Sequence, residues 1–155
     1  KDHAPECGGP LMQRRPSRGA AYGDLDRDGR IDVVVVNLDD WPQLLRNECT
    51  VSGHWLGLEL MTTEGANRHA LGARAELVLD DDRRVVRELH YGAGYLGSSD
   101  HGLHFSFPKT RRVKELIVRW PNGAEQRLPP PPVDAWSKLA QSATTYSPRG
   151  PKSPR

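Results

Sequence analysis

The sequence predicts an all-β protein in two parts, a single repeat of a larger array followed by a small antiparallel β-sandwich or barrel-like domain. Most apolar residues occur in short runs that are β-branched or alternate with polar residues, which is typical of strands. Fifteen glycines and thirteen prolines among 155 residues imply many turns. Helix signals are nearly absent before residue 134.

The first part opens with an irregular leader, residues 1–18, which is polar and rich in proline and arginine. Residues 19–50 are predicted to form the repeat. Its strands are "IDVVVVN" (31–37), which is β-branched, and the shorter "QLLRNE" (43–48). Because the valines occupy both alternating faces, we expect the first strand to be covered on both sides, like an inner strand of a stacked blade.

The second part, residues 55–128, shows period-two alternation. "WLGLEL" (55–60) sends its three leucines to one face of a strand. "DDDRR" (80–84) and "PNG" (121–123) are turn signals that predict hairpins. The other expected strands are "GARAELVL" (72–79), "RVVRELH" (84–90), "LHFSF" (103–107), "VKELIVRW" (113–120) and "AEQRL" (124–128).

Residues 129–155 are predicted to be a proline-rich, basic and disordered tail. It begins with the polyproline run "PPPP" (129–132). Within it, "DAWSKLAQSA" (134–143) is compatible with a short helix that Asp134 would cap.

The composition excludes several classes of function. The net charge of +2 mixes both signs, so no general field attracts nucleic acid. The longest apolar run is "VVVV", which is far too short to span a membrane. The chain begins with Lys1 rather than Met, so the lack of a signal peptide does not define the compartment. Cys7 and Cys49 are two buried thiols or one disulfide.

The aspartate loop, residues 24–32, carries the pattern D-x-D-x-D-G-x-x-D. Its carboxylates repel one another unless a cation or several donors neutralise them. Alternate side chains of a tight loop converge on one point, carboxylate oxygens suit Ca²⁺, and Gly29 would supply the sharp turn with a positive φ. The predicted ligands are the side chains of Asp24, Asp26, Asp28 and Asp32 and the main-chain carbonyl of Arg30, whose side chain is expected to point outward.

An EF-hand loop opens with the same pattern, but two features argue against it. Its twelfth position must be a bidentate glutamate, and that position is Val35 here. It also needs flanking helices, whereas valines follow this loop directly.

The segment "AAYGDLDRDGRIDVVVVN" resembles the calcium loop of an FG-GAP or VCBS repeat, the blade unit of integrin-α-type β-propellers. The later motifs "N-R-x-A-x-G-A", "G-x-G-Y", "L-H-F" and "W-P-N-G", in this order, are similar to the ASPIC/UnbV domain of the cartilage acidic protein-like family. Together the two resemblances cover residues 19–128. They imply a secreted, calcium-binding propeller followed by a small β domain, although one repeat alone cannot close a propeller.

His90, His101 and His104 surround a stretch that contains serines and Asp100, so a hydrolase is an alternative. No G-x-S-x-G elbow is present, and no third zinc ligand accompanies the close pair of histidines. We expect His90 and His104 to lie on strands and His101 in the loop between them. "NRHALGAR" (67–74) is expected to be a corner that satisfies its own backbone, with a ligand pocket as the alternative.

These observations predict a non-enzymatic, extracellular or periplasmic protein that binds Ca²⁺ and acts as an adhesion or interaction module. Its partner would be a protein or a polysaccharide, and the chain would be a monomer or a fragment of a larger propeller chain. A hydrolase and an isolated carbohydrate- or ligand-binding β domain are the alternatives.

Overall fold

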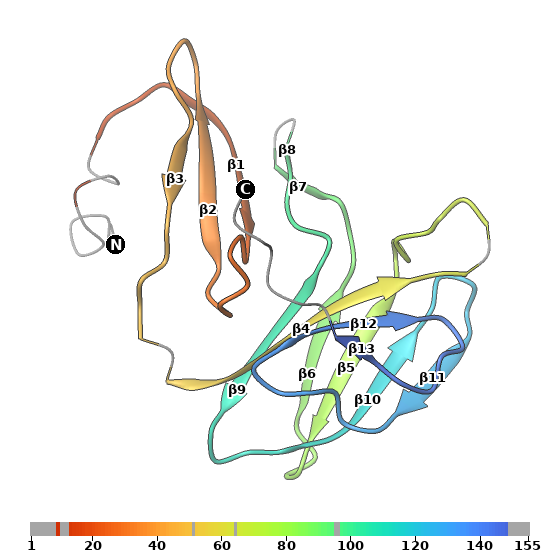
Figure 1. Cartoon of the computed structure of the whole chain (residues 1–155). Coiled ribbons are helices and arrows are strands. Elements are labelled where there is room, and N and C mark those ends of the chain that lie inside the picture. The colour runs from red at the N-terminus through yellow and green to blue at the C-terminus, as the bar shows by residue number, and fades with distance from the viewer. Residues whose placement is uncertain (1–8, 10–12, 51, 64, 95–96, 149–155) are drawn as a thin grey trace.

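The computed structural model describes residue 9 and residues 13–50, 52–63, 65–94 and 97–148. Every element defined among them is a β-strand, which confirms the all-β prediction (Figure 1). None of the described residues belongs to a helix that is long and apolar enough to cross a membrane. The strands are β1 (Ser17–Gly23), β2 (Asp32–Asn37), β3 (Gln43–Leu45), β4 (Gly53–Met61), β5 (Arg74–Leu79), β6 (Arg84–Glu88), β7 (Gly92–Gly94), β8 (Gly97–Ser98), β9 (Leu103–Pro108), β10 (Val113–Arg119), β11 (Glu125–Leu128), β12 (Trp136–Ala140) and β13 (Ser147–Pro148).

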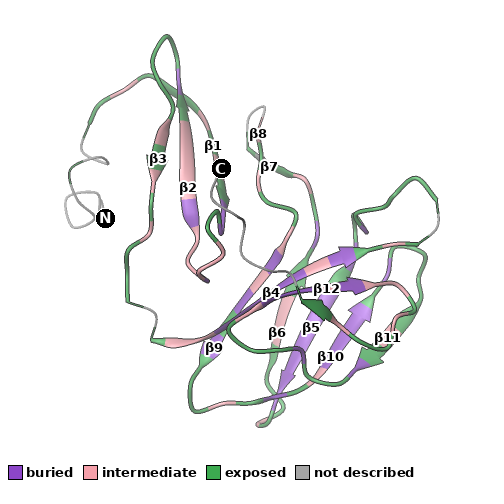
Figure 2. Ribbon diagram, viewed as in Figure 1, coloured by how far each residue is buried: buried purple, intermediate pink, exposed green. Residues whose placement is uncertain are grey.

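The N-terminal sheet has the order β1-β2-β3, and both of its pairings are antiparallel. Both strands predicted in this segment are therefore present. The expectation that the valine strand is covered on both faces is wrong for the described residues, because Val36 is 52% exposed and the other three valines are only half-buried. A single sheet of three strands supplies no second layer to cover either face (Figure 2).

Eight of the other strands form a β-sandwich, with two four-stranded sheets around one core, while β7 and β8 form a separate two-stranded sheet that contacts β1. One sheet has the order β11-β10-β5-β6, and the other has the order β13-β12-β4-β9. The three leucines of β4 point into the core as the alternation predicted, while Gly57 and Glu59 point to the opposite face. Figure 2 shows that the buried residues are concentrated in these sheets. No closed barrel or propeller is found in the described segments.

Strand β12 corrects the prediction for the C-terminal segment, because residues 136–140 form a strand and not part of a helix. This strand runs parallel to β4, with Leu139 opposite Leu60, and Leu139 is fully buried. Asp134 caps no helix. Its carboxylate accepts hydrogen bonds from the Trp55 amide (3.1 Å) and from His54 Nδ1 (2.9 Å), which fixes the start of β12 beside β4.

The disordered-tail prediction for residues 129–155 is therefore wrong over residues 136–148, which carry β12 and β13. Pairing with the free edge of β4 satisfies the backbone of β12 and buries apolar side chains, so this segment completes the sheet. Residues 149–155 lie outside the described residues.

Three predicted turns are confirmed. The turn at 80–82 joins β5 to β6, and that at 121–123 joins β10 to β11 with a φ of 86° at Gly123. Asn67 closes its own corner, because its side chain donates to the Leu71 carbonyl and accepts from the Leu71 amide, both at 2.9 Å.

The cysteine prediction can be followed only in part. Cys49 is exposed, so the interpretation as a buried thiol is wrong for this residue. Cys7 lies outside the described residues, and the disulfide hypothesis stays a prediction.

Candidate metal centre

The aspartate loop connects β1 to β2 and gathers three of its four carboxylates. Asp24, Asp26 and Asp28 each offer an oxygen, and these atoms all lie within 4.8 Å of one another. Asp24 is buried (4% exposed), Asp28 is half-buried and Asp26 is exposed. Alternate residues of the loop thus converge on one point, as the spacing predicted.

Backbone geometry explains how the loop turns. Gly29 has a φ of 88°, which confirms the positive value expected there, and Arg27 adds a second positive φ of 63°. Asp24 accepts hydrogen bonds from the amides of Asp28 (3.0 Å) and Gly29 (2.9 Å). The Asp24 carboxylate at the start of the loop therefore holds the backbone of residues 28 and 29 close to it, which closes the loop.

Asp32 lies outside this group of carboxylates. Its two oxygens accept hydrogen bonds from the amides of Asn47 (2.9 Å) and Leu25 (3.3 Å), and the side chain is buried. Asp32 thus connects the base of the loop to the chain that follows β3. The structure supports a structural role for Asp32, and its role as a ligand stays a prediction.

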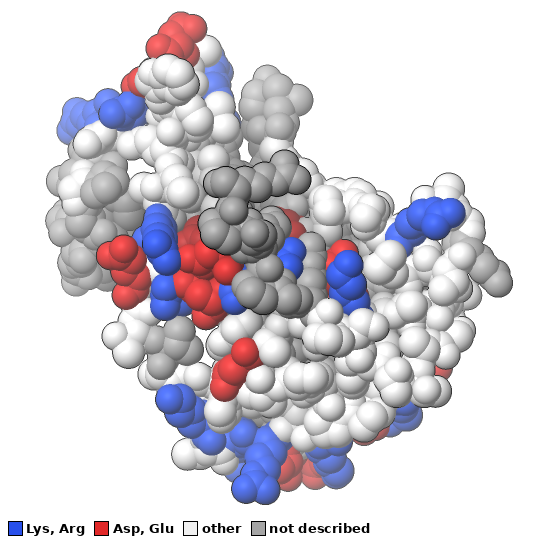
Figure 3. All heavy atoms as spheres, viewed as in Figure 1, with Lys and Arg blue, Asp and Glu red and all other residues white. Residues whose placement is uncertain are grey.

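Arginines neutralise the carboxylates of Asp26 and Asp28. The Arg30 guanidinium forms an ion pair with Asp28 and donates to the Asn47 carbonyl at 2.6 Å, so the expectation that this side chain points outward is wrong. Arg46 forms an ion pair with Asp26 at 2.7 Å. Figure 3 shows acidic side chains gathered in this region with basic side chains beside them. Protein donors can therefore offset the repulsion that the sequence predicts.

The loop contacts the outer face of the sheet β13-β12-β4-β9 through three aromatic residues, which we call the docking face: Trp55, His104 and Trp136. The Trp136 indole Nε1 donates to Asp24 Oδ2 at 2.8 Å. His104 Nε2 and the Gly29 carbonyl lie 2.9 Å apart, so this nitrogen carries the proton. Gly29 itself packs against the Trp55 ring, which stacks on His104 at 5.8 Å between centroids.

Burial lowers the pKa of His104 below its ordinary value, and the hydrogen bond to the Gly29 carbonyl partly opposes this shift. Loss of solvent disfavours the charged imidazolium more than one neutral acceptor favours it. His104 is therefore neutral near pH 7 and acts as a hydrogen-bond donor to the loop.

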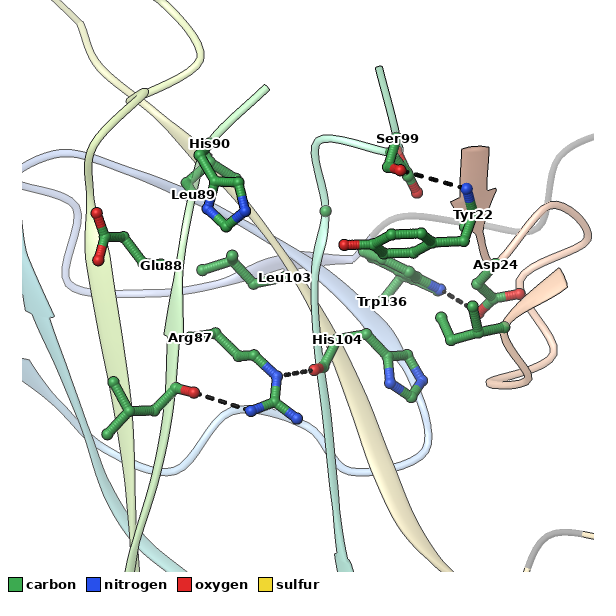
Figure 4. A pocket seen from close by; sticks show the side chains of 15 residues that line it. Tyr22, Asp24, Arg87, Glu88, Leu89, His90, Ser99, Leu103, His104 and Trp136 are labelled. Carbon is green, nitrogen blue, oxygen red and sulfur yellow. Dashed lines mark hydrogen bonds between the residues drawn. The ribbon is translucent and has the colours of Figure 1, made fainter. Parts of the chain in front are cut away.

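A cavity of about 380 Å³ lies between the loop, β6 and β9. Figure 4 shows the Tyr22 ring with its hydroxyl group directed into the cavity, and the hydrogen-bonded pair of Trp136 and Asp24 at one side. Arg87 lines another side, where its guanidinium donates to the His104 carbonyl at 3.0 Å and to the Val86 carbonyl at 2.9 Å.

The three histidines of the hydrolase alternative lie in different surroundings. His104 is on β9 as expected, whereas His90 follows the end of β6 and is exposed, so its placement on a strand was wrong. His101 is in a loop as expected and contacts Tyr91 edge to face at 4.4 Å. The Ser99 hydroxyl accepts a hydrogen bond from the Tyr22 amide at 3.3 Å.

Sequence reasoning gives Trp136 no role in the site, because it lies in a predicted tail whose residues 134–143 are compatible with a short helix. It placed His104 on a strand but gave it no part in the loop. Each lies more than 70 positions from its partner in the loop, so no local spacing links them. The sequence offers one signal for Trp136. Aromatic residues make up only 6% of the chain, and a tryptophan is usually largely buried, so its presence in a predicted tail is unexpected.

The fold and the site define a class of protein, namely an all-β module whose sandwich carries a docked acidic loop. The family model described as "ASPIC and UnbV" matches residues 63–145, more than half of the chain, and the chain belongs to this family. The match extends past residue 128 and includes β12, in agreement with its place in the core.

A curated relative is similar over a longer stretch. The chain is 29% identical over 108 residues to cartilage acidic protein 1 of Xenopus tropicalis. This alignment covers 68% of the chain and 16% of the relative, so the chain spans only a small part of that protein's length. The resemblance of residues 19–50 to an FG-GAP or VCBS repeat stays a prediction.

Proposed function

We propose that this protein is a non-enzymatic, calcium-binding interaction module of an extracellular protein. The observation that carries the proposal is the convergence of Asp24, Asp26 and Asp28, whose carboxylate oxygens lie within 4.8 Å of one another. Ca²⁺ prefers several carboxylate and carbonyl oxygens in a flexible loop. The donor set fits this ion, since it is all oxygen and contains no thiol or imidazole.

Asp24, Asp26 and Asp28 would hold the ion, and the Arg30 carbonyl and Asp32 are the further predicted ligands. A bound Ca²⁺ would supply the charge that Arg30 and Arg46 supply in the structure. The arginines would then turn toward solvent, which costs little for Arg46 because its side chain is already 57% exposed.

The extracellular location is part of the proposal. The name of the 29% identical relative associates that protein with cartilage, and the sequence resemblance implies secretion. The interaction role is supported by apolar side chains on the N-terminal sheet and the loop before β3, where Trp41 is 84% exposed and Leu44 is 60% exposed. Such residues suit a protein or polysaccharide partner.

A thermal melt of the full chain, with calcium and after thorough chelation, tests the proposal. Extracellular calcium modules bind at about 10⁻⁴–10⁻³ M, and an ion at ten times its Kd stabilises by about 1.4 kcal/mol. We expect calcium to raise the Tm and magnesium to raise it less. Identical curves with and without calcium would contradict calcium binding.

Two matched variants locate the site. Asp28 and Asp81 each accept a hydrogen bond from the amide two residues ahead, and each forms an ion pair with the arginine at that position. Asp28→Ala removes a central ligand and is expected to abolish the calcium-dependent Tm shift, whereas Asp81→Ala should retain it. An equal loss in both variants would mean that the ion does not bind at the loop.

The 380 Å³ cavity favours a second candidate function, binding of a small polar ligand such as a saccharide. Its lining combines the half-exposed Tyr22 ring with the polar side chains of Arg87 and Asp100. Saccharide titration of the wild type and of Tyr22→Ala, followed by calorimetry, tests this candidate. Binding that Tyr22→Ala leaves unchanged would place the ligand elsewhere.

A further inference from the structure

The Asp24 carboxylate has nearly all of its acceptor positions occupied by protein donors. A carboxylate offers about four lone-pair positions, two on each oxygen. Oδ2 accepts from the Gly29 amide (2.9 Å) and from Trp136 Nε1 (2.8 Å), so both of its positions are filled. Oδ1 accepts from the Asp28 amide (3.0 Å) and keeps one position. Trp136 therefore decides which oxygen of Asp24 is left to bind an ion.

The Trp136 ring is held firmly in place. A Cβ atom at Gly57 would lie 2.1 Å from this ring, and one at Gly102 would lie 2.3 Å from it, so the indole is packed closely against both backbones. The ring is 5% exposed, and β12 is fixed beside β4 with Trp136 opposite Gly57. An indole packed in this way presents its N–H in a fixed direction.

A second contact holds the same loop at Gly29. His104 Nε2 donates to the Gly29 carbonyl at 2.9 Å, and the Trp55 ring packs against Gly29. The two ends of the segment from Asp24 to Gly29 are thus attached to one face of one sheet.

We propose that Trp136 is a positioning residue for the metal centre, so that the ASPIC/UnbV sandwich, and not the loop alone, sets the calcium affinity. This inference rests on the proposed function. Because Oδ2 is saturated by the Gly29 amide and Trp136, Oδ1 is the Asp24 oxygen with a position left for an ion, and Asp24 is one of the three convergent carboxylates. Removal of a group that orients a metal ligand lowers metal affinity by about 10- to 100-fold.

The test compares two buried tryptophans in the full chain. Trp136→Phe removes the N–H that reaches Asp24, and Trp120→Phe removes an N–H that reaches Gln126 at 3.0 Å on the far side of the core. Calcium titration by calorimetry should give a Kd about 10- to 100-fold weaker for Trp136→Phe and an unchanged Kd for Trp120→Phe. An unchanged Kd in Trp136→Phe would overturn the inference and leave the proposed function intact.

A nuclear magnetic resonance measurement on the wild-type chain tests the same inference without any substitution, so it does not depend on whether a variant folds. The indole N–H resonance of Trp136 should shift on addition of calcium, because the charge on Asp24 is then shared with the ion, while that of Trp120 should stay in place. A Trp136 resonance that does not move at saturating calcium would overturn the inference. Failure of the wild type to bind calcium at all would instead refute the proposed function.

Discussion

Gly29→Ala is the substitution that most directly tests the contact between the loop and the sandwich. Gly29 has a φ of 88°, and a Cβ added there would lie 2.2 Å from Cε2 and 2.3 Å from Nε1 of Trp55. The Trp55 ring cannot retreat easily, because it is 8% exposed and stacked on His104. The loop must therefore move away from the docking face.

The magnitude follows from three costs. An alanine in the left-handed region costs about 1–2 kcal/mol. Carbon atoms in contact are separated by about 3.5 Å, so the new methyl group requires a displacement of about 1.3 Å, and overpacking of this kind costs about 1–3 kcal/mol. The 2.9 Å hydrogen bond from His104 would be stretched as well, at a cost of about 1 kcal/mol. Together these costs should lower the free energy of unfolding of Gly29→Ala by about 3–6 kcal/mol.

Gly123→Ala is the matched control. Gly123 has nearly the same φ, 86°, but a Cβ added there would meet nothing within 4 Å. Backbone strain therefore cancels between the two variants, and the control should lose only about 1–2 kcal/mol. Equilibrium urea unfolding of the full chain, followed by circular dichroism, measures both losses. Equal losses in the two variants would refute the close packing of Gly29 on Trp55.

Three further predictions concern the sandwich and its junction with the loop. Leu139→Ala should lower the free energy of unfolding, measured by urea unfolding, by about 2–5 kcal/mol, because Leu139 is fully buried. A neutral effect would mean that β12 is not part of the core. Arg84→Ala should cost about 1–3 kcal/mol by the same assay, since it removes the 2.9 Å partner of the buried Glu76. Arg119→Ala, which breaks an exposed pair with Glu125, should cost less. Because burial lowers the pKa of His104, the unfolded chain takes up a proton more readily, and stability should fall as the pH drops below about 6.5. His104→Gln should reduce this dependence of the free energy of unfolding on pH, measured by urea unfolding. An unchanged dependence would contradict its assignment to His104.

The strands of the sandwich could be predicted because their pattern is local. In β4 and β5, apolar residues alternate or run continuously between turn residues, and the core face of each strand is set by its own sequence. The hairpin turns were equally accessible, since Gly123 and the aspartates at 80–82 favour the backbone angles that those turns need.

Strand β12 could not be predicted in the same way. Trp136, Leu139 and Ala140 are three and four positions apart, a spacing that also fits one face of a helix. What decides the outcome is the open edge of β4, which lies about 80 positions earlier in the sequence and pairs with β12 in parallel. The valines of β2 were predicted to lie on a strand, and they do. Their burial could not be predicted, because the sequence shows apolar faces but not whether another layer covers them.

In the candidate site, too, the local features could be predicted from the sequence and the long-range contacts could not. The spacing of Asp24, Asp26 and Asp28 predicts their convergence, because a tight loop brings alternate side chains together. The donors that reach the loop from elsewhere depend on the folded chain. Arg46 follows β3 and Trp136 is on β12, and both bind aspartates of the loop, while His104 on β9 binds the Gly29 carbonyl. The sheets bring all three to the loop from distant positions in the sequence.

The junction between the loop and the sandwich bears on how the chain should be divided. The sequence pattern changes between residues 50 and 55, which predicts two units, yet two hydrogen bonds of the loop cross that boundary. Asp24 is buried and accepts hydrogen bonds from Trp136 and from loop amides, and a buried carboxylate that loses a donor is costly. Undocking of the loop would remove the Trp136 hydrogen bond and the His104 hydrogen bond together. The loop and the sandwich should therefore open as one cooperative unit, with hydrogen exchange at the Gly29 amide and at the Trp136 indole slowed to the same degree. A Gly29 amide that exchanges much faster than the Trp136 indole would show that the loop opens on its own.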